Sequence, residues 1–292
     1  MRITHTWTDE AATIKIEGLA ATVRLLHVTD THLALIDERD ADHVEACSGA
    51  HDRFGARRLD ADGNNVFTET TFDTIMAGAT SMGTGIDLLA HTGDLIHFPS
   101  QANIERASAG LTGTGLEFMY TSGNHDWLFS GVENVAGLRE QNWPLLDTLT
   151  GGRASHEARD IGGIRFVAVD NSIYQVSEAQ LEFVVEQLSA GLPTVLLTHI
   201  PISLPTLRGP TIQKWETPLL MADPAGDPLQ AGTDVTIEFV RTLLTATNLV
   251  ANFCGHVHFE HIDSISPGAV QYVGTPAFET GRSRLFEFQP LP

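Results

Sequence analysis

The sequence predicts one α/β domain, because short apolar runs that end in polar residues alternate with helical patterns along most of the 292 residues. Runs of this length, rich in Val, Ile, Leu and Phe, are typical of strands that are buried on both faces. The composition, with 42% hydrophobic and 18% charged residues, is that of a folded globular protein. No internal repeat or low-complexity linker divides the chain, so we expect a single domain over residues 1–292.

The strands can be assigned in chain order. Residues 2–18 alternate apolar and polar side chains on either side of a break at residues 8–11, which predicts an N-terminal β-hairpin. Open α/β sheets bind ligands at the carboxyl ends of their strands, so we expect the site where the next six runs end. These apolar runs with polar ends lie at residues 23–30, 87–94, 116–126, 164–170, 194–199 and 249–258. Three shorter strands joined by Gly and Pro turns complete the chain at residues 262–265, 269–274 and 283–288.

Four helices are expected between these strands. The pattern at residues 177–190 is the clearest, because Ser177 and Gln180 form a capping box ahead of apolar residues at helical spacing. Two further segments, 36–67 and 201–231, fit neither pattern, and at about thirty residues each they are interpreted as lids or substrate-shaping insertions. The four helices are predicted at residues 68–82, 100–109, 177–190 and 234–245.

Charge and cysteine content exclude several classes of protein. The chain has 17 Lys and Arg against 37 Asp and Glu, a formal net charge of −20. Nucleic acid is normally bound by a basic face, so this balance disfavours nucleic acid as a partner. The sequence has no apolar run of about 18 residues and its N-terminus lacks the apolar stretch of a secretory signal, so we expect a soluble cytoplasmic protein without a membrane partner. Cys47 and Cys254 are too few for a disulfide framework, and we expect both to be reduced.

Five separated clusters carry metal-binding side chains at or just beyond the strand ends. Their donors are carboxylates, imidazoles and an amide, a set that suits Mn, Fe, Co and Zn and does not suit a soft thiolate site. Asp30 and His32 are two residues apart and can point the same way, and so can His256 and His258. The clusters are Asp30-Thr31-His32, Gly93-Asp94, Gly123-Asn124-His125-Asp126, His199 and Gly255-His256-Val257-His258.

This ordered set closely resembles the motifs of the calcineurin-like metallophosphoesterase superfamily, which are D-x-H, G-D, G-N-H-D or G-N-H-E, H, and G-H-x-H. The resemblance covers most of the chain. It implies a β-sandwich of two mixed sheets flanked by helices, with a dinuclear metal centre at the strand ends. Residue by residue, it implies that Asp30, His32 and His258 bind one metal, that Asn124, His199 and His256 bind the other, and that Asp94 bridges the two.

The resemblance also implies the chemistry. Two divalent metal ions (Mn, Fe, Zn or Co) held about 4 Å apart lower the pKa of a shared water, so that a metal-bound hydroxide attacks the phosphorus. His125 would steady the phosphate or protonate the leaving oxygen. Asp126 would then hold the ring of His125, which makes this pair the candidate catalytic residues.

The residues around the motifs distinguish subgroups of the superfamily. Asp94 is followed by Leu95-Ile96-His97, which lacks the Asp-Arg-Gly of the protein Ser/Thr phosphatases and has His97 where purple acid phosphatases have a metal-binding Tyr. Pyrophosphatases of lipid A precursors usually have Arg at the position of His125. Recombination nucleases share all five blocks but need DNA-binding surfaces and further domains, which the acidity and the length argue against. The motif set is most similar to that of class III cyclic-nucleotide phosphodiesterases and the related small glycerophosphodiesterases.

We therefore expect hydrolysis of a small-molecule phosphodiester, such as a cyclic nucleotide or a glycerophosphodiester. A phosphomonoesterase or nucleotidase on the same site is the alternative, because the five blocks do not separate the two activities. A DNA nuclease and a non-catalytic scaffold are weaker alternatives, since scaffolds of this superfamily have lost motif histidines and every expected ligand is present here. The sequence leaves the oligomeric state open.

The two long segments supply the candidate substrate-binding residues. Their arginines could bind a phosphate bidentately, or they could belong to a solvated or salt-bridged loop. Trp215 could stack on a base, or it could anchor its loop through its apolar ring. The candidates are Arg53, Arg57, Arg208 and Trp215, with Arg58 and Lys214 beside them. Three histidines near the motifs are interpreted as partners of the ligands or as structural residues and are set aside as ligands, namely His91, His97 and His261.

Overall fold

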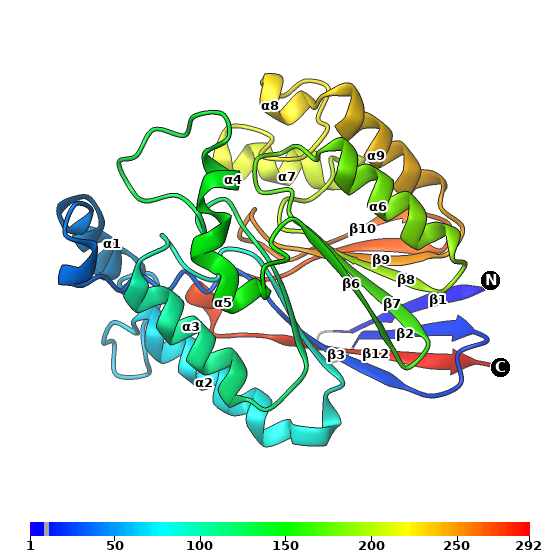
Figure 1. Ribbon diagram of the computed structural model, residues 1–292. Helices are drawn as coiled ribbons and strands as arrows, with labels where there is room; N and C mark the ends of the chain where they lie inside the picture. The colour runs from blue at the N-terminus through cyan, green and yellow to red at the C-terminus, as the bar shows by residue number, and fades with distance from the viewer. Residues whose placement is uncertain (9–11) are drawn as a thin grey trace.

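Two six-stranded mixed sheets lie face to face in this computed structural model, which describes residues 1–8 and 12–292 (Figure 1). The first sheet has the strand order β1-β2-β12-β3-β4-β5, and the second has the order β10-β11-β9-β8-β7-β6. Helices cover the outer face of each sheet, which gives four layers (Figure 1). This architecture is the helix-flanked β-sandwich that the motif resemblance implies.

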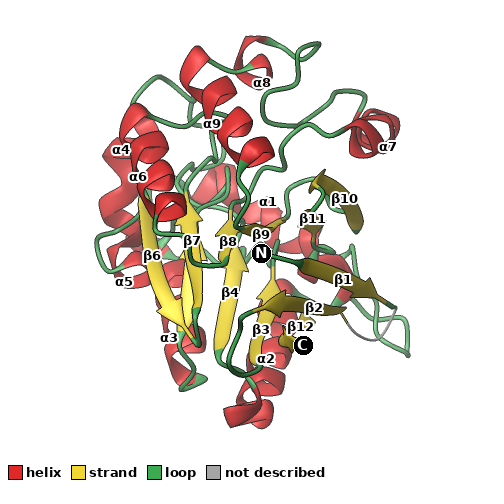
Figure 2. Ribbon diagram, turned by 90° about the vertical axis from the view of Figure 1, so that its right-hand side faces the viewer, coloured by secondary structure: helices red, strands yellow, loops and turns green. Residues whose placement is uncertain are grey.

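The second sheet is parallel in the middle and antiparallel at both edges, whereas the first is antiparallel between β1 and β2 and between β12 and β3 and parallel elsewhere. In the first sheet β3, β4 and β5 are parallel, and in the second β7, β8, β9 and β11 are parallel, with β6 reversed at one edge (Figure 2). The first sheet consists of β1 (Ile3–Trp7), β2 (Ala12–Glu17), β12 (Arg284–Leu291), β3 (Val23–Val28), β4 (Leu88–Thr92) and β5 (Phe118–Thr121). The second consists of β10 (His261–Ser266), β11 (Ala269–Val273), β9 (Leu249–Cys254), β8 (Thr194–Leu197), β7 (Ile164–Val169) and β6 (His156–Ile161).

The helices divide between the two outer faces and the loops around the strand ends. The first sheet is covered by α2 (Thr68–Met82) and α3 (Gln101–Gly113), and the second by α6 (Glu178–Ser189) and α9 (Asp234–Thr245). The others are η1 (Glu38–Asp40), α1 (Val44–Gly55), η2 (Gly83–Gly85), α4 (Leu138–Asn142), η3 (Trp143–Leu146), α5 (Asp147–Thr150), α7 (Pro205–Trp215), α8 (Pro228–Ala231) and α10 (Ala277–Thr280).

The core between the sheets is apolar and contributed by both. Leu25 and Phe286 of the first sheet meet Phe166, Val195 and Phe253 of the second. Burying one such side chain stabilises the fold by about 1.5–3 kcal/mol. The packed core therefore fixes the two sheets against each other, and with them the loops that follow their parallel strands.

Most of the predicted elements are confirmed. The N-terminal hairpin pairs Ile3 with Ile16 and Trp7 with Ala12, whereas residues 9–11 of its predicted break lie outside the described residues. The capping box at Ser177 is present, and the predicted helix 100–109 extends further, as α3. Several elements were not predicted, namely β6, the short helices α4, α5 and α10, and the helices within the two long segments, α1, α7 and α8.

Candidate metal centre

All five motif clusters lie in loops that directly follow parallel strands. Asp30 and His32 follow β3, Asp94 follows β4, and the 123–126 cluster follows β5. His199 follows β8 and the 255–258 cluster follows β9. Loops from both sheets meet here, because the imidazole Nδ1 of His199 donates to the carbonyl of Thr92 at 2.8 Å. The site therefore spans the open end of the sandwich.

The loops after β3 and β4 continue the pairing of their strands. The backbone N–H of Asp30 donates to the carbonyl of Gly93 at 3.1 Å, and that of His32 to the carbonyl of Asp94 at 2.9 Å. These bonds hold the loops in a strained conformation. Five donor residues have left-handed backbone angles, with φ of 53° at Asp30, 44° at His32, 49° at Asp94, 70° at His256 and 56° at His258. This conformation costs a non-glycine residue about 1–2 kcal/mol, and such strain is concentrated at functional sites.

Two glycines allow the loops to approach closely. A Cβ atom on Gly93, where φ is 89°, would lie 2.4 Å from Nδ1 of His199. A Cβ atom on Gly123 would lie 2.2 Å from Oδ1 of Asp94. The glycines of the second and third clusters are therefore required by packing around the donor residues.

A first donor group contains Asp30, His32, Asp94 and His258, whose donor atoms all lie within 4.8 Å of one another. The Nε2 atom of His32 is 3.2 Å from Nε2 of His258 and 3.5 Å from Oδ2 of Asp94. The Nε2 atom of His258 is 3.3 Å from Oδ1 of Asp30. This arrangement brings together every residue that the resemblance assigns to the first metal.

A second donor group contains Asp94, His199 and His256. The Nε2 atom of His199 lies 3.3 Å from Oδ2 of Asp94. The hydroxyl of Tyr174 lies 2.9 Å from Nε2 of His256, so that Nδ1 of the ring is free to bind a metal when Nε2 donates to Tyr174. Tyr174 and Asn171, whose Oδ1 accepts from the backbone N–H of His199 at 3.0 Å, follow β7 and were missed by the sequence analysis. The only signal for them was the polar end of that apolar run.

Asn124 lies next to Asp94, the residue that the two donor groups share. Gly123 packs on Asp94, and the backbone N–H of His125 donates to Oδ1 of Asp94 at 3.0 Å. Both chain neighbours of Asn124 therefore contact the shared carboxylate. Its Oδ1 atom is buried and has no hydrogen-bond partner among the described residues, and Nε2 of His199 makes no well-formed hydrogen bond although it lies 3.3 Å from Oδ2 of Asp94. Buried polar atoms without partners are costly, and a cation would satisfy both.

Burial and neighbouring charges set the protonation of the donors. Burial raises the pKa of Asp94, but His199, His125 and His32 outweigh it and hold the pKa well below its ordinary value. Burial lowers the pKa of His32 far below 6.5 and that of His256 to about 3. Burial would also lower the pKa of His199, but the Asp94 carboxylate raises it to about 9. Ionised carboxylates and neutral imidazoles are the forms that bind metals, so most of this set is ready to do so.

The donor set therefore fits two divalent cations. Asp30, His32 and His258 would hold one, Asn124, His199 and His256 would hold the other, and Asp94 is shared because its carboxylate belongs to both groups. Nitrogen and oxygen donors without a thiolate suit Mn, Fe, Co and Zn.

Asp126 has a different role from the one expected. Its Oδ1 accepts from the backbone N–H of Ile96 at 2.8 Å, and its Oδ2 from that of Gly123 at 2.6 Å. Both carboxylate oxygens are thus directed at backbone, and Asp126 ties the loop after β4 to the loop after β5. We correct the expectation that it holds the ring of His125.

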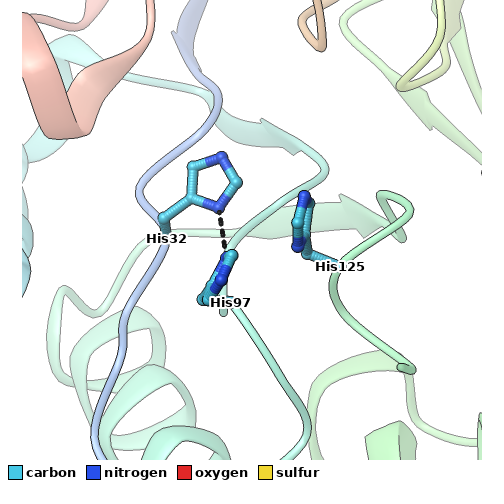
Figure 3. Close-up of side chains that lie close together, drawn as sticks. All are labelled: His32, His97 and His125. Carbon is cyan, nitrogen blue, oxygen red and sulfur yellow. Dashed lines mark hydrogen bonds between the residues drawn. The ribbon is translucent and has the colours of Figure 1, made fainter. Parts of the chain in front are cut away.

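The three histidines that were set aside differ in position. His91 is buried and its Nε2 lies 3.1 Å from the hydroxyl of Thr31, while His261 lies 2.9 Å from the hydroxyl of Thr206. His97, however, lies close to His32 and His125, and these three rings form a third group of possible ligands that is separate from the two donor groups (Figure 3). The ring centroids of His97 and His125 are 4.4 Å apart and nearly parallel. Burial lowers the pKa of His97 to about 3.

A pocket of about 280 Å³ opens over the first donor group. Arg53 of α1, Arg57 just beyond the end of α1 and Trp215 of α7 line it, so the structure brings three predicted substrate-binding residues to the site. Trp215 also donates from Nε1 to the carbonyl of Val257 at 2.8 Å, which anchors α7. Phe54 and Phe278 complete the aromatic wall and were not predicted.

The other candidates do not line this pocket. Arg208 donates to the buried carboxylate of Asp223 at 2.9 Å, and this pairing corrects its assignment to substrate binding. Arg58 donates to the hydroxyl of Thr71 at 2.8 Å. Lys214 donates to the carbonyl of His258. These three cations support the loops around the site.

The chain belongs to the calcineurin-like phosphoesterase family, whose model matches residues 23–260. This span includes all five motif clusters, and membership implies hydrolysis of a phosphoester. A comparison with curated proteins finds no match. Within residues 1–8 and 12–292, no helix has both the length and the apolar character needed to cross a membrane.

Solved structures share the fold at low sequence identity. A dimetal phosphatase from Danio rerio is 12% identical, with a TM-score of 0.53, and the match covers 89% of this chain and 90% of that one. A purple acid phosphatase from yellow lupin (Lupinus luteus) seeds is 13% identical, with a TM-score of 0.56, and the match covers 97% of this chain and 57% of that one. These likenesses confirm the β-sandwich.

Proposed function

We propose that this chain hydrolyses a small-molecule phosphodiester at a centre of two divalent metal ions. The observation that carries the proposal is a pair of donor groups that share one carboxylate, Asp94, beneath a pocket lined by two arginines. When bound, two such cations lower the pKa of a shared water and neutralise a phosphoryl group for in-line attack.

His125 is proposed to act on the leaving group. Its ring lines the pocket, and its backbone is fixed by the hydrogen bond to Asp94. The ring centroid lies 5.0 Å from that of His32, which places His125 beside the first donor group. From there it can donate a proton to the oxygen that leaves phosphorus.

The lining of the pocket supports a diester as substrate. Arg57 already donates to Glu279 at 2.5 Å, whereas Arg53 has no carboxylate within 4.0 Å among the described residues. Apart from the proposed metal ions, the pocket wall therefore offers Arg53 as the cation that can bind a phosphate oxygen. The apolar rings of Phe54, Trp215 and Phe278 suit an uncharged organic substituent beside the phosphate.

The test is a paired assay on Mn²⁺-loaded and chelator-treated protein. The substrates are bis-p-nitrophenyl phosphate, p-nitrophenyl phosphate and 3′,5′-cyclic AMP, and the replacement Asp94→Asn is the metal-site control. We expect diester cleavage that chelator abolishes and that D94N lacks. A preference for the monoester would overturn the diester proposal and indicate a phosphatase. If none of the three substrates is cleaved in a metal-dependent way, the proposal is contradicted.

A further inference from the structure

His97 contacts a donor residue from outside the two donor groups. It lies in the loop after β4, three residues beyond Asp94, and its Nδ1 is 3.3 Å from Nδ1 of His32 (Figure 3). Both rings are buried, with exposed fractions of 8% for His97 and 0% for His32. The contact therefore joins two ring nitrogens away from bulk water.

The chemistry of His32 determines which nitrogen donates. Nε2 of His32 faces the first donor group, as its distances to His258 and Asp94 show. An imidazole nitrogen binds a cation only when it carries no proton, so the proton of neutral His32 must be on Nδ1. That N–H points at His97, whose Nδ1 must then act as the acceptor. The opposite arrangement, with His97 donating, would put the proton of His32 on Nε2 and block metal binding.

The backbone around His97 is held firmly enough to maintain this contact. Its N–H donates to the carbonyl of Leu33 at 2.7 Å, and the preceding residue, Ile96, is bound by Asp126. The ring packs between two others, with centroid distances of 4.4 Å to both His125 and Phe54. The side chain of His97 thus has a defined position relative to His32.

We propose that His97 is a positioning residue that accepts a hydrogen bond from His32 and so selects the tautomer of His32 that binds metal. The proposal rests on the proposed function in one respect, that His32 is a metal ligand. Hydrogen-bond partners of this kind fix the orientation of metal-binding histidines and raise their basicity.

The test compares three replacements by Mn²⁺ titration of the metal-free protein, followed by calorimetry. In His97→Asn the amide oxygen can take the position of Nδ1, whereas in His97→Gln an extra methylene moves it away, and His97→Phe keeps the ring but has no acceptor. We expect H97N to bind both ions within about threefold of the wild-type affinity, and H97Q and H97F to bind one ion about 10–100-fold more weakly. His5→Asn is the matched control and should leave Mn²⁺ affinity unchanged. His5 is hydrogen-bonded to Tyr272 and belongs neither to the two donor groups nor to the pocket above them.

Other outcomes overturn the proposal. If H97F keeps its affinity and H97N loses it, ring packing and not the acceptor is what matters. If the wild type binds two ions and H97Q binds them equally well, His97 has no positioning role, although the metal centre stands. If the wild type binds no Mn²⁺, both the metal centre and the role of His97 fail. Circular dichroism of the metal-free variants checks their fold, and if H97F does not fold, the contrast between H97N and H97Q decides alone.

Discussion

At the residue scale, the site is built from side chains that are buried, strained and held by backbone bonds. Asp30, for example, has an exposed fraction of 0% and a left-handed backbone, and its carboxylate accepts from the backbone N–H of His256. Contacts with surrounding residues maintain this backbone conformation, which an aspartate rarely adopts by itself. The strain is understandable if these donors are preorganised for cations, because their directions are then set before a metal arrives.

Replacing His125 separates leaving-group chemistry from metal binding. We expect His125→Ala to lower kcat about 10²–10³-fold on 3′,5′-cyclic AMP, whose leaving alcohol needs a proton. The effect on bis-p-nitrophenyl phosphate should be smaller, because p-nitrophenolate leaves without help. Mn²⁺ affinity should be unchanged, as measured by calorimetry. Equal losses of kcat on both substrates would count against His125 as a proton donor.

His27 makes stability depend on pH. It is fully buried on β3, its Nε2 lies 2.7 Å from the hydroxyl of Thr92, and burial lowers its pKa to about 3. Below pH 6.5 the unfolded chain therefore binds a proton that the folded chain does not, so stability is lost as the pH falls. At about pH 5, protonation of His27 in the unfolded chain lowers the free energy of unfolding by about 2 kcal/mol relative to neutral pH.

The replacement His27→Gln should remove the proton that the unfolded chain binds at this position. Denaturant unfolding of the metal-free protein at about pH 8 and about pH 5 should show a smaller pH difference for H27Q than for the wild type, by about 2 kcal/mol. Any loss of stability in H27Q that is common to both pH values reflects packing and cancels in the comparison. An unchanged pH difference would mean that His27 is protonated in the folded state.

At the scale of secondary-structure elements, helices α1 and α7 have a different role from the loops that follow the strands. The loops hold the donors through bonds such as those from Asp126 to Ile96 and Gly123. The two helices contribute the walls of the pocket, with Arg53 on one and Trp215 on the other. Changes in the loops should therefore affect metal binding, and changes in α1 should affect substrate binding.

The replacement Gly123→Ala tests the loop after β5. The added Cβ would lie 2.3 Å from the backbone N of Asp94, so the loop must move. We expect a loss of stability of about 1–3 kcal/mol and weaker Mn²⁺ binding. Gly78→Ala is the matched control, because a Cβ there meets nothing within 4 Å and the position is inside α2. It should be neutral or slightly stabilising in thermal unfolding, and weakened Mn²⁺ binding in both variants would rule out a specific effect of G123A.

The replacement Arg53→Ala tests the substrate wall. Loss of a charge-assisted contact to phosphate should raise KM for bis-p-nitrophenyl phosphate about tenfold while kcat and Mn²⁺ affinity stay the same. Arg241→Ala, at an exposed arginine on α9 that pairs with Glu238, should leave all three unchanged. A normal KM in R53A would remove Arg53 from the substrate site.

At the scale of the whole molecule, much of the site could be predicted because the motifs follow buried strands. Parallel strands in two stacked sheets bring their carboxyl ends together, so Asp30, Asp94 and His199 converge although they are far apart in sequence. The roles of Asp126, Arg208 and His97 could not be predicted, because they depend on contacts between loops. The helix α7 was missed since Pro210 interrupts its pattern, and α1 was missed because its segment reads as an irregular insertion.

We propose that one chain binds two metal ions and that Asp94 is shared between them. The most direct measurement is the Mn²⁺ content of the wild type and of Asp94→Asn after equilibrium dialysis, with folding of both checked by circular dichroism. We expect two ions per wild-type chain and loss of tight binding of both in D94N, because the same carboxylate belongs to both donor groups. A folded wild-type protein that retains fewer than two ions, or a D94N variant that retains both, would contradict it.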